Sequence, residues 1–344
     1  MIDHKLYYED IQNVVLQYKN VDLDNAKILI TGASGLIGTV LTDVFMNMDK
    51  NISVTVMSRG EDKIKQRFGN YIGNDRFNYV LADVNFPILE CGDFDYIIHA
   101  ASNTHPTSYS SDPIGTITAN IIGTKNLLDY AILHHTKRFI FLSTVEIYGE
   151  NRGDVEKFSE DYCGYIDCNT TRAGYPESKR VGESLCQSYA QKYGIDVVIP
   201  RICRVYGATM SGDDSKALAQ FIRNAVNGED IVLKSKGNQL FSYCYVSDIV
   251  SGIIKIMLDG KSGEAYNISD PNSDITLADL AGLLAKNAGT KVIFELPNEN
   301  EAKGFSKVTK ALLDSTKLRV LGWETLISIE QGVRRTLGIL KSIQ

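Results

Sequence analysis

The chain has 344 residues, of which 44% are hydrophobic and 23% are charged, so it is long enough to bury a full globular core. Its formal net charge of −6 gives no electrostatic case for nucleic-acid binding. No apolar run approaches the length that spans a membrane, and the first residues lack the apolar core of a signal peptide, so we expect a cytoplasmic protein without membrane contact.

Residues 1–24 are expected to form a helical extension ahead of the first domain. Acidic residues are mixed there with apolar and aromatic ones, namely Tyr7, Tyr8, Ile11, Val14, Val15 and Tyr18. This pattern is typical of an amphipathic helix. We expect the helix to pack on the body of the chain, with a contact to a partner as the alternative.

A glycine-rich turn follows the first expected strand. Residues 27–30 are an apolar run of strand length, and the apolar residues from 36 to 44 recur at helical spacing. Between them, a strand, a tight turn and a helix N-terminus direct backbone N–H groups and a positive dipole at one point, which suits a dinucleotide pyrophosphate. An ordinary strand-to-helix turn is the alternative. The expected cofactor contacts in this turn are Gly32, Ser34, Gly35, Leu36, Ile37 and Gly38.

Further strands and helices alternate along the chain. Strands are expected at residues 52–57, 79–84, 96–101 and 138–143, and a long helix at 114–133. The alternation predicts a Rossmann-type, doubly wound parallel α/β sheet, whose ligands bind at the carboxyl ends of its strands. We expect an NAD(P)-binding domain at residues 25–180. Residues 181–344 would then form mainly a smaller, interleaved α/β substrate domain, with segments that return to the first.

The end of the second strand bears on the choice of cofactor. NAD sites usually place an acid there, but this chain has Ser58 and Arg59. A guanidinium beside a small hydroxyl residue can bind a 2′-phosphate, which favours NADP; NAD is the alternative if Arg59 stacks on adenine or faces water. The other expected cofactor contacts are Asp83, Val84, Ala100, Ala101, Ser102, Tyr175, Lys179 and Ile202.

Tyr175 and Lys179 lie at the start of another expected helix, which Gly194 ends. Their four-residue spacing places a phenol and an ammonium on one helix face. A nearby cation stabilises phenolate, so tyrosine can act as a base near neutral pH. The alternative is an ordinary exposed helix surface, because this spacing is common there.

With these motifs in order, the chain resembles the extended short-chain dehydrogenase/reductase family, specifically its nucleotide-sugar epimerase, dehydratase and decarboxylase group. The resemblance covers about residues 27 to 337. It also includes residues 97–101, 120–128, 143–149, 201–207, 245–248 and 263–268.

The resemblance implies that hydride leaves C4 of a nucleotide-linked sugar while Tyr175 takes the hydroxyl proton. Lys179 would be the partner of Tyr175, and Thr144 would hydrogen-bond at the reacting oxygen. The 4-keto sugar acidifies the C5 proton, and Glu146 stands where 4,6-dehydratases keep a glutamate that removes it. Val145 stands where one dehydratase branch has a proton-donating aspartic acid and where other dehydratases and the decarboxylases have serine.

Several alternatives to the dehydratase or decarboxylase hypothesis remain open. The chain could be a 4-epimerase, although simple C4 epimerases usually lack the glutamate at position 146. It could be a 4-keto reductase, or a non-catalytic protein that kept the fold. Glu146 itself could make a structural hydrogen bond under the sugar site.

Two departures from the family pattern concern the substrate. Arg204 stands where the family commonly has asparagine, and Phe241 where it commonly has arginine. Arg204 is expected to supply the missing positive charge to the diphosphate, with a different or absent nucleotide as the alternative. Phe241 is expected either to stack on a base or simply to pack. Thr104 is a further expected substrate contact. Arg201 and Arg172 are additional candidates for the diphosphate, with a structural ion-pair role as the alternative for either.

The resemblance also implies a homodimer packed through the helices around Asn120 and Tyr175. The six cysteines form no C-x-x-C pair and no histidine has zinc-site spacing, so we expect reduced thiols and no metal site.

Overall fold

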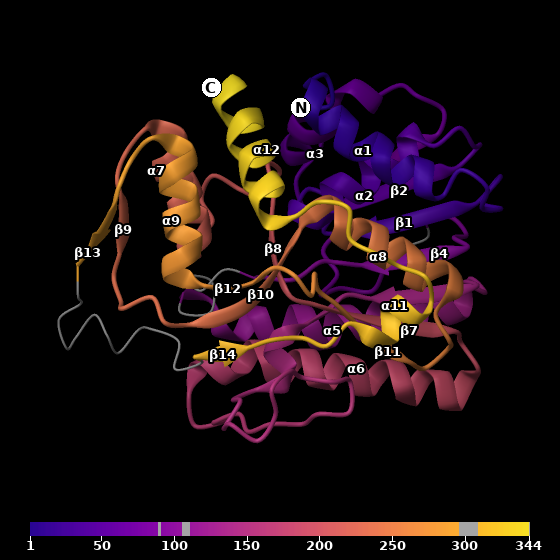
Figure 1. Cartoon of the computed structure of the whole chain (residues 1–344). Coiled ribbons are helices and arrows are strands. Elements are labelled where there is room, and N and C mark those ends of the chain that lie inside the picture. The colour runs from indigo at the N-terminus through magenta and orange to yellow at the C-terminus, as the bar shows by residue number, and fades with distance from the viewer. Residues whose placement is uncertain (89–90, 105–110, 296–308, 344) are drawn as a thin grey trace.

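The computed structural model describes residues 1–88, 91–104, 111–295 and 309–343 (Figure 1). Its largest sheet has the strand order β11-β7-β5-β4-β1-β2-β3, with β6 also paired to β7, and all of these pairings are parallel. The strands are β1 (Lys27–Thr31), β2 (Ser53–Ser58), β3 (Phe77–Leu81), β4 (Tyr96–His99), β5 (Arg138–Phe141), β6 (Ser143–Thr144), β7 (Val197–Ile202) and β11 (Ala265–Ile268). The predicted doubly wound sheet is confirmed.

Helices cover both faces of this sheet. They are α2 (Leu36–Asn47), α3 (Glu61–Phe68), α5 (Pro113–Leu133), α6 (Gly174–Tyr193) and α8 (Val246–Asp259), while α1 (Lys5–Gln17) packs on α2 and α8. Along β1, Ile28 and Ile30 join the core beneath α2 and α8, whereas Leu29 joins the core beneath α5 and α6. Strands that are buried on both faces read as continuous apolar runs, which is why they could be found in the sequence.

Three predicted strands end earlier than the sequence suggested. β3 stops at Leu81 rather than at residue 84. β4 stops at His99, and Ala100 continues past Gly32, whose missing side chain leaves room for the Ala100 backbone. The expected strand at residues 138–143 is interrupted at Leu142, so that Ser143 and Thr144 form the separate β6 paired with β7. This bend brings Thr144 to the carboxyl edge of the sheet.

The second half of the chain builds smaller sheets and also returns to the main one. β8 (Arg204–Tyr206), β12 (Asp274–Thr276) and β14 (Lys310–Ala311) pair with β10 (Leu240–Tyr245), while β9 (Ile231–Leu233) pairs with β13 (Val292–Phe294). The helices here are α7 (Ala217–Asn227), α9 (Leu277–Ala288), α11 (Thr316–Val320) and α12 (Ile329–Ser342). Figure 1 shows α7, α9, β9 and β13 to one side of the main sheet. β7 and β11 join that sheet, but the expected domain boundary near residue 180 stays a prediction.

The N-terminal helix α1 packs on the chain itself, against α2, α8 and α12. The Tyr7 hydroxyl donates to the Asp43 carboxylate on α2 at 2.5 Å. Asp10 is buried and accepts hydrogen bonds from Tyr245 at 2.7 Å and from the Arg335 guanidinium at 2.6 Å. The helix therefore ties α2 to β10 and α12. Among the described residues, we find no helix with the length and apolar character needed to cross a membrane.

Candidate active site

The glycine-rich turn has the backbone geometry expected of a pyrophosphate cradle. Gly32 adopts φ +66°, and a Cβ there would lie 2.7 Å from the backbone of Ala100. A Cβ on Gly38 would lie 2.5 Å from the carbonyl oxygen of Gly32, so the first turn of α2 closes tightly on the loop. Gly35 is the N-cap of α2. The N–H groups of this helix start are available to an anion, and the residues here fit a dinucleotide.

The other expected cofactor contacts lie at the carboxyl ends of neighbouring strands. Ser58 ends β2, Asp83 follows β3, Ser102 follows β4 and Ile202 ends β7. Ser102 donates a hydrogen bond to the buried Asn120 of α5 at 2.7 Å. The structure thus brings together positions scattered over 145 residues of sequence, as a doubly wound sheet requires. Val84, Ala100 and Ala101 lie beside them along the chain, and the Arg59 side chain is exposed.

Thr144 and Tyr175 meet at this edge. Tyr175 lies in the first turn of α6 and is 7% exposed. Burial raises the pKa of Tyr175 well above its usual range, the hydrogen bond with the Thr144 side chain lowers it, and the negative charge of Glu146 raises it. Before substrate and cofactor arrive, the phenol is therefore protonated, and Thr144 is the neighbour that favours its ionisation.

Lys179 is buried on the same face of α6, one turn further along. Its ammonium donates to the Leu142 carbonyl oxygen at 2.8 Å and lies 4.7 Å from the centroid of the Phe141 ring. Burial lowers the pKa of Lys179 to about 8, an effect that the charge of Glu183 opposes. Lys179 therefore fixes the bend between β5 and β6 that presents Thr144.

Glu146, Arg204 and Phe241 form a second cluster. Glu146 lies in the 3₁₀ turn Val145–Tyr148, two residues after Thr144. Its carboxylate is 3.7 Å from the Arg204 guanidinium, whose central carbon lies 3.5 Å from the centroid of the Phe241 ring. The pairing of β8 with β10 brings the last two together. Phe241 is 5% exposed, so the structure gives its ring a packing role beneath Arg204. Thr104 is half-buried after β4.

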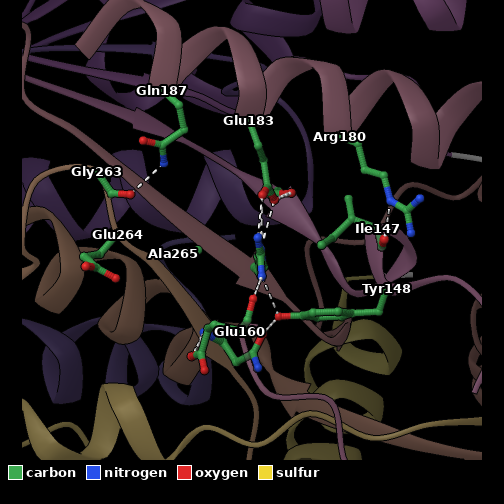
Figure 2. A network of polar contacts seen from close by, with 12 residues as sticks. Ile147, Tyr148, Glu160, Arg180, Glu183, Gln187, Gly263, Glu264 and Ala265 are labelled. Atoms are coloured by element: carbon green, nitrogen blue, oxygen red, sulfur yellow. Dashed lines mark hydrogen bonds and ion pairs between the residues drawn. The ribbon is translucent and has the colours of Figure 1, made fainter. Parts of the chain in front are cut away.

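Sequence reasoning missed a buried polar network behind Thr144 (Figure 2). Glu183 on α6 accepts hydrogen bonds from Ser143 at 2.5 Å and from Arg201 at 2.7 Å. Arg201 also donates to the Tyr148 hydroxyl at 3.0 Å and to the Glu160 carbonyl oxygen at 2.6 Å. Arg201, a candidate for the diphosphate, is thus a structural ion-pair partner, because its donors are already used inside the protein. The signal in the sequence was the four-residue step from Lys179 to Glu183.

The remaining polar candidates are simpler. Arg172 is exposed in the 3₁₀ turn Thr171–Ala173. His99 is fully buried at the end of β4, where its Nδ1 lies 2.8 Å from the Thr31 hydroxyl, and burial lowers its pKa to about 3. Within the described part of the chain, we find no cluster of three or more side chains suited to a metal ion.

Comparisons with known proteins agree with this geometry. UDP-glucuronic acid decarboxylase 3 of Arabidopsis thaliana is 33% identical over 313 residues, which are 90% of this chain and 87% of the relative. UDP-glucuronic acid decarboxylase 1 of Xenopus tropicalis is also 33% identical, over 91% of this chain and 72% of the relative.

Two similar solved structures show the same fold. A dTDP-glucose 4,6-dehydratase from Streptomyces venezuelae, with NAD bound, has a TM-score of 0.78 at 23% identity and covers 92% of this chain and 97% of its own. UDP-glucuronic acid 4-epimerase from Bacillus cereus, with UDP-glucuronic acid and NAD, has a TM-score of 0.77 at 22% identity, over 92% and 100%. The model of the NAD dependent epimerase/dehydratase family matches residues 28–269. Together with the 33% identity over nearly the whole chain, this match shows that the chain belongs to that family.

Proposed function

We propose that the protein oxidises C4 of a nucleotide-linked sugar and then carries out C5/C6 chemistry on the 4-keto intermediate. The observation that carries this proposal is the hydrogen-bonded pair of Thr144 and Tyr175 at the sheet edge where the glycine turn also lies. Glu146 stands two residues beyond Thr144, close enough for its charge to act on the Tyr175 phenol. An acid–base group for C4 and a second one for C5 are thus held in one place.

The first step follows from the positions of these side chains. A bound oxidised nicotinamide supplies the acceptor for the C4 hydride. Tyr175 takes the proton of the C4 hydroxyl, and Thr144 holds the phenol oxygen and stabilises its ionised form. Lys179, in its protonated form, adds positive charge to this region and anchors the strand end that carries Thr144.

The step after oxidation is proposed to be of the decarboxylase type. A 4-keto uronic acid loses CO₂ as a β-keto acid and needs no acid to protonate a leaving hydroxyl. Val145, which is apolar and 6% exposed beside Thr144, supplies no such acid. Loss of CO₂ breaks the C5–C6 bond and leaves an enolate, and Glu146 is the candidate group that passes a proton to C5 in this step or removes one from C5 in a dehydratase. A 4,6-dehydratase is the second candidate, favoured by the presence of Glu146 itself.

Arg204 and Thr104 are proposed to contact the substrate, with Phe241 supporting the Arg204 guanidinium from beneath. The Arg204 side chain is 25% exposed, and its guanidinium rests on the Phe241 ring. We assign it to the diphosphate, because guanidinium binds phosphate oxygens through paired hydrogen bonds.

For the cofactor, we propose NADP or NAD, with Ser58 and Arg59 favouring the 2′-phosphate of NADP. Arg59 is exposed directly after β2, where it can turn toward the adenine ribose. Dissociation constants for NAD and NADP, measured for the wild type and for Arg59→Ala, test this. A ratio that is unchanged by the substitution would remove Arg59 from the choice.

We also propose a cytoplasmic homodimer. α5 and α6 lie against each other, and Ile122 on α5 and Val181 on α6 are more than a third exposed although both are apolar. All six cysteines are free thiols, as in a reducing compartment. Sedimentation of the wild type and of Ile122→Asp tests the dimer, which the charged variant should dissociate.

The proposed reaction is tested with a panel of nucleotide sugars that includes UDP-glucuronic acid, UDP-glucose and dTDP-glucose. Products are identified by mass spectrometry while the absorbance of the reduced nicotinamide is followed. Loss of CO₂ from the uronic acid supports the decarboxylase, loss of water supports the dehydratase, and an unchanged mass with an inverted C4 supports the epimerase. Absence of product and of any nicotinamide reduction with every sugar would support the non-catalytic alternative.

A further inference from the structure

Three residues at four-residue intervals on α6 hold three successive residues of the strand end beside it. Tyr175 is hydrogen-bonded to Thr144, Lys179 donates to the Leu142 carbonyl oxygen, and Glu183 accepts from the Ser143 hydroxyl. Residues four apart share one face of a helix, so these contacts form a ladder along α6. Tyr175 and Lys179 take part in the proposed reaction, whereas no role has yet been given to Glu183.

Glu183 holds both members of a register pair in the sheet. Ser143 of β6 lies opposite Arg201 of β7, and Thr144 lies opposite Ile202. The Glu183 carboxylate receives the Ser143 hydroxyl at 2.5 Å and the Arg201 Nη2 at 2.7 Å. One buried side chain therefore fixes the register that places Thr144, the neighbour of Ser143, at the sheet edge.

The contacts of Glu183 with Ser143 and Arg201 are held in place because Arg201 also binds groups on its side away from Glu183. Its Nη1 donates to the Tyr148 hydroxyl and to the Glu160 carbonyl oxygen. Figure 2 shows Glu183 extending from α6 toward the layer that holds Tyr148 and Glu160. Tyr148 in turn donates to Asn267 of β11 at 2.6 Å. Buried groups whose hydrogen bonds are all satisfied have one well-defined arrangement.

Glu183 also lies one helical turn from Lys179 on α6, and its negative charge opposes the lowering of the Lys179 pKa. Three other titratable groups near the ammonium are neutral, namely His99, Cys186 and Tyr175. Burial lowers the pKa of His99 on β4 to about 3, and burial raises the pKa of Cys186 and of Tyr175 on α6. The Phe141 ring on β5 offers only its π face. The pKa of Lys179, lowered by burial to about 8, is kept from falling further by Glu183.

We propose that Glu183 is a positioning residue of the active site, which fixes Ser143 and thereby Thr144 against α6 and places a negative charge one helical turn from Lys179. This rests on the proposed function, in which Thr144 and Lys179 assist Tyr175. It adds that the reaction depends on a carboxylate that touches neither sugar nor cofactor.

The test uses two variants that separate position from charge. Glu183→Gln keeps the size and an acceptor oxygen for Ser143 but removes the charge. Ser143→Ala removes the hydrogen bond to the strand and leaves Glu183 paired with Arg201. The control is Gln187→Ala, one turn further along α6, where the exposed side chain donates to the Gly263 carbonyl oxygen.

The first measurement does not depend on catalytic activity. The titration of Lys179 is followed by NMR of protein with carbon-13-labelled lysine, and its signal is assigned by its loss in Lys179→Met. We expect the midpoint to move below that of the wild type in Glu183→Gln and to stay in place in Ser143→Ala and Gln187→Ala. An unchanged midpoint in Glu183→Gln would overturn the claim that the charge of Glu183 acts on Lys179, whatever reaction the protein catalyses.

The second readout is the rate at which bound nicotinamide is reduced by UDP-glucuronic acid or UDP-glucose, measured against pH. Misplacement of a catalytic group by about 1 Å can cost a hundredfold. We expect the rate to fall on the order of tenfold or more in Ser143→Ala and Glu183→Gln, and the alkaline limb of Glu183→Gln to lie at lower pH. Wild-type rates and pH profiles in both folded variants would overturn the positioning role. A wild type that never reduces its cofactor would instead count against the proposed function. The Lys179 titration would still show whether the charge of Glu183 acts on Lys179.

Discussion

Replacing Thr144 with valine removes one hydroxyl at the proposed reaction centre and changes the side-chain volume little. The Thr144 hydroxyl is the group that lowers the pKa of Tyr175 against the opposing effect of burial. A hydrogen bond to an ionised group contributes about 1.5–3 kcal/mol. If that contribution is made mainly as the phenolate forms, its loss slows hydride transfer by about ten- to a hundredfold. The same hydroxyl accepts only a long bond of 3.3 Å from the Glu146 N–H, so the local fold should persist.

The assay is rapid mixing of cofactor-loaded enzyme with a nucleotide sugar that the wild type turns over, while the absorbance of the reduced nicotinamide is recorded across pH. Since the phenolate of Tyr175 is harder to form in Thr144→Val, the rising limb of its profile should move to higher pH. Thr144→Ser keeps the hydroxyl and should stay within a few-fold of the wild type. A Thr144→Val enzyme with the wild-type rate and the wild-type limb would refute the reasoning.

Three further substitutions test other parts of the account. Gly38→Ala places a Cβ 2.5 Å from the Gly32 carbonyl oxygen, so we expect cofactor affinity to fall by about tenfold or more. Calorimetry measures this affinity, and an unchanged value would contradict the claim that the glycine-rich turn binds the cofactor. Glu146→Gln should leave nicotinamide reduction in place but abolish solvent-deuterium incorporation at C5, and wild-type-like incorporation would remove Glu146 from the mechanism. Burial raises the pKa of Asp43 from 3.8 to about 6, so the native state binds this proton more tightly than the unfolded chain. The contribution of Asp43 to the free energy of unfolding should therefore be largest below about pH 4 and be lost, by roughly 3 kcal/mol, as the pH rises through about 6. Denaturant series of the wild type and of Asp43→Asn should differ by this pH-dependent amount, and the same pH dependence in both would contradict it.

The parts of the site that were predictable from sequence are local. Gly32, Gly35 and Gly38 could be recognised because a strand and a helix flank them directly in the chain. Tyr175 and Lys179 could be placed on one face because the helical period fixes what a four-residue step means. In each case, the residues that determine the local geometry belong to one element or to two consecutive ones.

The parts that were missed depend on pairings between distant segments. The contact between Arg204 and Phe241 exists because β8 pairs with β10, and no local pattern states that pairing. The hydrogen bond between Glu183 and Ser143 depends on where β5 ends, which the sequence did not show because the apolar run 139–142 continues past that point. The role of α1 in joining the two halves of the chain likewise rests on Asp10 and on a residue 325 positions away.

The central claim is that hydride leaves C4 of the sugar while Tyr175 takes the proton. The most direct measurement supplies a nucleotide sugar that carries deuterium at C4 and determines the mass of the cofactor extracted during turnover. The account predicts deuterium in the nicotinamide for the wild type and none for Tyr175→Phe, although that variant still binds the cofactor. Deuterium that reaches the cofactor equally well in Tyr175→Phe, or that stays on a sugar which the wild type converts, would contradict it.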